Sequence, residues 1–96
     1  MVAFRTAKLF PLGDVVATPA ALAALEKAGQ PPLLFVMRHL RGDWGDVDPE
    51  DWQANDEALE SGERLLSAYR TSLGDRIWII TERDRSATTL LLPDEY

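Results

Sequence analysis

The spacing of the hydrophobic residues changes from a helical to an extended period near Arg64, and this change constrains the fold more than any other feature. After it, three runs of strand-forming residues alternate with turn sequences. These runs are Leu65–Thr71, Arg76–Thr81 and Thr88–Leu92. Because Ile77–Ile80 is hydrophobic on both faces, it predicts the central strand of an antiparallel meander.

Three helices are predicted before these strands. The first covers Ala20–Ala28 and follows Thr18-Pro19, an N-cap residue and a first-turn proline. The second covers Pro32–Leu40 and is apolar nearly all round. The third begins after the N-cap residue Asp48 and runs to about Ser61. Its few apolar residues predict that it lies on the outside of the molecule.

Two or three N-terminal helices followed by a three-stranded antiparallel meander make an α+β fold. Val2–Phe10 and Gly13–Ala17 are short extended pieces, so an N-terminal strand could join the meander. The 96 residues contain no repeat, low-complexity tract or linker. We therefore expect a single domain, residues 1–96.

The composition excludes several kinds of chemistry. The chain has no cysteine, which rules out disulfides, thiolate metal sites and cysteine nucleophiles. Its first ten residues lack the apolar run of a signal peptide, and no stretch approaches membrane-spanning length. We therefore expect a cytoplasmic protein that needs no cofactor.

The segment between Asp43 and Glu63 contains nine acidic residues and no lysine or arginine. The nine are Asp43, Asp46, Asp48, Glu50, Asp51, Asp56, Glu57, Glu60 and Glu63. The whole chain carries a net charge of −6, so the negative charge is concentrated here. Trp44 and Trp52 lie within the segment. Acidic side chains around aromatic anchors suit a basic partner and repel a phosphate backbone.

The predicted partner surface combines these tryptophans with nearby carboxylates. Its members are Asp43, Trp44, Asp46, Trp52, Asp56, Glu57 and Glu60. A plainer interpretation is a solvated helix face, with Trp44 as a plug over the core. Trp78 is predicted to be a core residue. The acidic residues do not follow the ligand spacing of a calcium loop, and we expect no metal site.

His39 is the only histidine, and it lies at the predicted end of the second helix. One interpretation is a cationic group at the negative end of the helix dipole. The alternative is a catalytic residue of a ribonuclease-like site, together with Arg70, Arg85, Ser86 and Thr88. These are residue types that such sites use.

Three phrases of the sequence resemble a family of small proteins found on bacterial plasmids, integrative elements and phages. They are Phe10–Pro19, Arg38–Asp46 and Arg76–Tyr96, and the resemblance extends from Leu9 to Tyr96. Members are usually labelled hypothetical or plasmid-related, and some carry the label of a type I restriction enzyme modification subunit. This chain lacks the glycine motif and the length that a methyltransferase needs. The resemblance thus implies a mobile-element setting and assigns no functional residue.

Two functions remain open on these grounds. The first is a non-enzymatic binding or inhibitory protein of a mobile element, of the anti-restriction or anti-CRISPR type, acting on a protein partner with a basic surface. The second is a small barnase-like ribonuclease toxin, suggested by helices followed by an antiparallel meander. The sequence pI of about 4.6 opposes RNA binding. We expect a protein that binds neither nucleic acid nor membranes, with no prediction of its oligomeric state.

Overall fold

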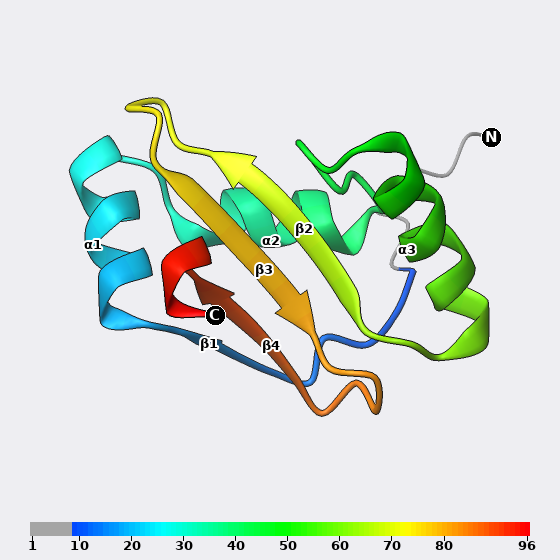
Figure 1. Cartoon of the computed structure of the whole chain (residues 1–96). Helices are drawn as coiled ribbons and strands as arrows, with labels where there is room; N and C mark the ends of the chain where they lie inside the picture. The colour runs from blue at the N-terminus through cyan, green and yellow to red at the C-terminus, as the bar shows by residue number, and fades with distance from the viewer. Residues whose placement is uncertain (1–8) are drawn as a thin grey trace, which may run out of the picture.

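The computed structural model describes residues 9–96, which form three α-helices and a four-stranded mixed sheet (Figure 1). The elements in chain order are β1 (Asp14–Ala17), α1 (Pro19–Ala28), α2 (Pro32–Leu40), α3 (Pro49–Ser61), β2 (Leu65–Arg70), β3 (Arg76–Thr81), β4 (Ala87–Leu91) and the 3-10 helix η1 (Pro93–Glu95). The predicted α+β class is confirmed.

The three predicted strands form the antiparallel part of a larger mixed sheet, and the N-terminal strand that the sequence left open joins it in parallel. Its strand order is β1-β4-β3-β2, so β3 lies inside the sheet as predicted. The pairs β2-β3 and β3-β4 are antiparallel, whereas β1 pairs with β4 in parallel. This parallel pair joins Asp14 to Ala87 across most of the chain. The extended piece Gly13–Ala17 indicates this strand, but its partner and direction depend on distant residues.

The helix ends are fixed by the capping residues that the sequence predicts. The Thr18 hydroxyl accepts a hydrogen bond from the Ala21 N–H at 3.1 Å, which caps α1. The Asp48 carboxylate accepts one from the Asp51 N–H at 2.9 Å, which caps α3. Gly62 ends α3 with φ of 78°, a left-handed conformation that glycine adopts without steric cost.

The two faces of the sheet differ along β2 and β3 because side chains alternate between them. We define the closed face by Ser67, Tyr69, Ile77, Ile79 and Thr81, all of which are buried. The open face carries Leu66, Ala68, Arg70, Arg76, Trp78 and Ile80, of which only Ile80 is buried. In Figure 1, α2 lies behind the sheet, whereas no α-helix crosses the front of β2 and β3.

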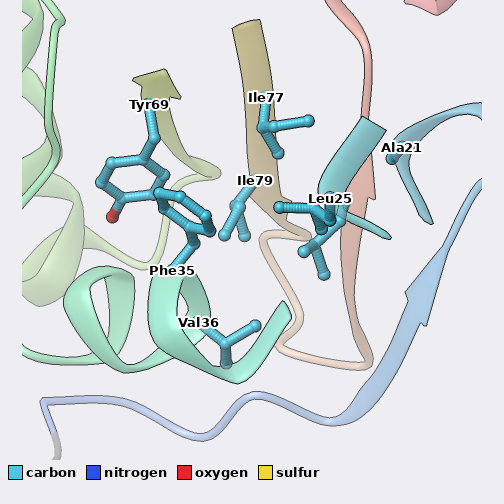
Figure 2. Close-up of a cluster of buried hydrophobic side chains, with 8 residues drawn as sticks. Ala21, Leu25, Phe35, Val36, Tyr69, Ile77 and Ile79 are labelled. Carbon is cyan, nitrogen blue, oxygen red and sulfur yellow. The ribbon is translucent and has the colours of Figure 1, made fainter. Parts of the chain in front are cut away.

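The main hydrophobic core fills the space between the closed face and the helices α1 and α2 (Figure 2). Phe35 of α2 lies against Tyr69 of β2, with the ring centroids 5.5 Å apart. Leu25 of α1 and Val36 of α2 belong to the same cluster, with Ile79 in the sheet. Hydrophobic residues at helical spacing on the helices thus meet alternating residues on the strands, as the two periods require.

One prediction about packing needs correction. Trp78 was expected in the core, but it lies half-buried on the open face because its position in β3 alternates with Ile77 and Ile79. Of the predicted extended piece Val2–Phe10, residues 2–8 lie outside the described residues. Within residues 9–96, no helix is long and apolar enough to cross a membrane.

Candidate functional site

The acidic segment folds into two parts, a loop before α3 and α3 itself. Within the described part of the chain, three of its nine carboxylates form ion pairs: Asp43 with Arg38 at 2.7 Å, Asp46 with Arg70 at 3.5 Å, and Glu63 with Arg83 at 3.3 Å. None of these three belongs to α3. Within residues 9–96, the carboxylates of α3 have no ion-pair partner.

Asp43 has a structural role in the loop. The guanidinium of Arg38 donates to it and lowers the pKa of the Asp43 carboxyl, and the Gly45 N–H adds a second hydrogen bond. The same pair raises the pKa of Arg38, whose guanidinium also lies 4.5 Å from the centre of the Tyr69 ring. The Tyr69 hydroxyl donates to the Asp43 carbonyl at 2.6 Å. Asp43 therefore holds the loop against β2.

Trp44 is a plug over the core, and the prediction of an exposed partner contact at this position is wrong. Its side chain is 0% exposed. It belongs to a second cluster with Phe10 and Leu65, and its ring meets His39 edge-on at a centroid distance of 5.5 Å. The indole N–H donates to the Asp56 carboxylate at 3.0 Å. An apolar ring between two glycines is buried here because the loop turns back onto β2.

The loop and α3 together cover the outer edge of β2. The Ala68 N–H donates to the Trp44 carbonyl at 3.0 Å, and the Asp46 N–H donates to the Ala68 carbonyl. The Asn55 side chain binds both the N–H and the carbonyl of Leu66, at 3.1 and 2.8 Å. Gly45 lies so close to this edge that an added Cβ would meet the Ala68 carbonyl oxygen at 2.0 Å. These contacts complete an edge that would otherwise expose unpaired backbone groups.

The outer side of α3 presents a continuous row of carboxylates beside one tryptophan. We call this the acidic surface, and its members are Glu50, Trp52, Asp56, Glu57 and Glu60. Trp52, Asp56 and Glu60 follow one another at four-residue steps and so lie on one side of the helix. The side chain of Trp52 is 36% exposed. Only Asn55 and Ala58 of α3 are buried, which confirms that the helix lies on the outside.

Arg85 stabilises the end of this helix. The last turn of α3 has no basic residue, although carbonyl groups at a helix C-terminus favour cations. From the turn between β3 and β4, the Arg85 guanidinium donates to the Ala58 carbonyl at 3.1 Å and to the Glu63 carbonyl at 2.7 Å. Arg85 is therefore engaged in holding α3.

His39 lies at the centre of a closed chain of hydrogen bonds. Its side chain is 0% exposed. Nδ1 lies 2.5 Å from the Ser67 hydroxyl, and Nε2 lies 2.8 Å from the Thr81 hydroxyl. The Thr81 and Thr88 hydroxyls lie 2.8 Å apart, and Thr88 donates to the Leu12 carbonyl at 2.7 Å. Each of these buried side chains therefore has a hydrogen-bond partner.

The last hydrogen bond of this series determines which nitrogen of the His39 imidazole carries the proton. Because the Thr88 proton goes to a carbonyl, Thr88 accepts the Thr81 proton, and Thr81 then accepts from His39 Nε2–H. Nδ1 is left as the acceptor for Ser67. Burial, with a smaller effect from the Arg85 charge, lowers the pKa of His39 to about 4. His39 is thus neutral at pH 7, and the prediction of a cationic cap is wrong.

The five residues of the ribonuclease-like alternative do not form one accessible site. His39 and Thr88 share the buried chain, and Arg85 holds α3. Arg70 projects from the open face, on the other side of the sheet from Ser67 and Thr81. Ser86 is exposed and its N–H donates to the Asp84 carboxylate. No substrate can reach His39 in this arrangement.

Ser67, Thr81 and Asn55 were missed by the sequence reasoning. A signal for the first two exists, because each lies two residues from a buried hydrophobic residue of its own strand and so points to the same face. Asn55 lies three residues before Ala58 on the inward side of α3, where a polar residue is unusual. No protein-family model, curated protein or solved structure matches this chain.

Proposed function

We propose that this protein is a non-enzymatic binding or inhibitory protein of a mobile genetic element, and that its acidic surface binds the basic surface of a protein partner. The observation that supports this most strongly is the unpaired state of the α3 carboxylates within residues 9–96. Carboxylates at Glu57 and Glu60 also face the unfavourable end of the helix dipole. A helix that served only to cover β2 would gain from a lysine at these positions.

Trp52 gives the acidic surface an apolar anchor. Tryptophan is the residue type that most often contributes large binding energy at protein interfaces, because it buries a wide flat area. Carboxylates around such an anchor can imitate the charge of a phosphate array and occupy a nucleic-acid-binding channel of a host defence protein. The same charge opposes binding of nucleic acid by this protein itself.

Three of the carboxylates can be tested without disturbing the fold. The variant combining Glu50→Gln, Glu57→Gln and Glu60→Gln spares Asp56, which holds the Trp44 indole. Its charge-matched control combines Glu26→Gln, Glu82→Gln and Asp94→Asn, which are exposed residues outside α3. Affinity capture from host cytosol should recover one specific protein with the parent chain and with the control, but not with the α3 variant.

The interaction should weaken as salt is added, since exposed charges are screened within about 8 Å at physiological ionic strength. Equal recovery of the partner by the α3 variant and the control would contradict the proposal. Cleavage of RNA by the purified protein would favour the ribonuclease alternative, for which the buried His39 offers no support.

A further inference from the structure

The open face carries a second charged feature, of the opposite sign. Arg70 of β2 and Arg76 of β3 are direct cross-strand partners on this face. The backbone N–H and carbonyl of Ala68 point away from β3 toward the loop, and those of Arg70, two residues later, point the same way. Arg70 and Arg76 are therefore a pair without mutual backbone hydrogen bonds. Side chains of such pairs approach each other most closely. Two like charges in that position destabilise a sheet. An anion between them would relieve this repulsion.

A small hollow adjoins the two arginines. It has a volume of about 90 Å³ and is lined by Asp46, Ala68, Tyr69, Arg70, Arg76 and Trp78. Ala68 is the cross-strand partner of Trp78, so a small side chain beside a large flat one leaves the space. Tyr96 packs edge-on against the Trp78 ring, with centroids 5.8 Å apart, and supports that wall.

The guanidinium groups are available to an added ligand. Arg70 and Asp46 are 3.5 Å apart and both side chains are more than half exposed, so this ion pair is loose. Within residues 9–96, Arg76 has no ion-pair partner. An arginine offers five N–H donors in a planar fork that matches a carboxylate. Asp46 shows that a carboxylate can approach Arg70 in this geometry.

We propose that the hollow between Arg70, Arg76 and Trp78 binds an aspartate or glutamate side chain of an extended segment of a partner protein. A hollow of about 90 Å³ is much smaller than a pocket for a drug-sized ligand, and its size suits one carboxylate. A nucleic-acid strand fits less well, because its closely spaced phosphates need a row of cations, whereas the hollow is lined by two arginines.

This site is separate from the acidic surface, so either proposal can fail alone. The probe is the peptide acetyl-Gly-Glu-Gly-amide, compared with the same peptide containing Gln. The readout is the NMR signals of the Trp78 indole N–H and the arginine Nε–H groups in the ¹⁵N-labelled protein. The Glu peptide should shift the Trp78 and Arg76 signals with a millimolar Kd, leave the Trp44 signal in place, and bind far more strongly than the Gln peptide.

Arg76→Gln should weaken binding of the Glu peptide about two- to fivefold, since exposed charge pairs contribute less than a factor of ten. Arg83→Gln is the matched control, because it removes one exposed positive charge outside the hollow and should leave the Kd unchanged. Equal binding of the two peptides, or equal effects of the two variants, would overturn the proposal. Tighter binding of five-nucleotide oligothymidylate than of the Glu peptide would also overturn it and assign the site to nucleic acid.

Discussion

The two faces of the β2-β3 pair belong to the same strands but differ in how their polar groups are paired. On the closed face, Ser67 and Thr81 find complete hydrogen bonding through His39 while hydrophobic neighbours exclude water. On the open face, Arg70 and Arg76 face each other with incomplete charge compensation. Buried polar groups that are fully paired specify one structure. Exposed charges that lack compensation do little for stability and are available for binding.

The largest expected contrast between the two sides concerns Trp44 and Trp78. Trp44→Ala should destabilise the protein by about 3–5 kcal/mol, because it empties a fully buried site and leaves Asp56 without its donor. Trp78→Ala should cost less, about 2–3 kcal/mol, since its ring is partly exposed in the folded state. Urea unfolding followed by far-UV circular dichroism measures both. Equal losses would mean that the open face is as much a part of the core as the closed one.

The next expected effect is a pH dependence of stability that arises from His39 at the closed face. His39 has a pKa of about 4 when folded and an ordinary value of 6.5 when unfolded, so the unfolded chain binds more protons between these values. The contribution of His39 to the free energy of unfolding is complete above its unfolded-state pKa. It decreases as the pH falls toward its folded-state pKa. The loss should be about 2 kcal/mol between pH 7 and pH 5.

The chain has no other histidine, so His39→Gln should remove most of this slope. Free energies of unfolding from urea titrations at the two pH values give the comparison. An unchanged slope in the variant would show that the imidazole reaches water in the folded state, and the closed face would then be less closed than its hydrogen bonds indicate.

The difference between the faces also explains which features could be predicted from the sequence. The caps Thr18 and Asp48, the three helices and the interior position of β3 follow from local patterns, and the structure agrees. The parallel pairing of β1 depends on contacts between residues 14–17 and 87–90, and no local pattern encodes it.

For the site, charge was predictable and burial was not. The exposed carboxylates of α3 follow from the high density of acidic residues in this segment of the sequence. The burial of Trp44 and His39 depends on how the loop after α2 folds back onto β2, which is a tertiary event. Trp78 shows the same limit in the other direction, because a strand that is hydrophobic on both sides does not reveal which side a helix will cover.

The smallest expected effect has the opposite sign and belongs to the acidic surface. Replacing Glu50, Glu57 and Glu60 with glutamine removes like charges at three- and four-residue spacing and two charges near the wrong end of the helix dipole. Each such interaction is worth a few tenths of a kcal/mol, while Glu50 at the first turn is lost as a favourable charge. The variant should therefore be as stable as the parent or more stable by up to about 0.5 kcal/mol. Urea unfolding at low salt measures the difference, which should shrink when salt is added. A clear loss of stability would mean that these carboxylates make favourable contacts within the fold, and their value for a partner would lose its physical basis.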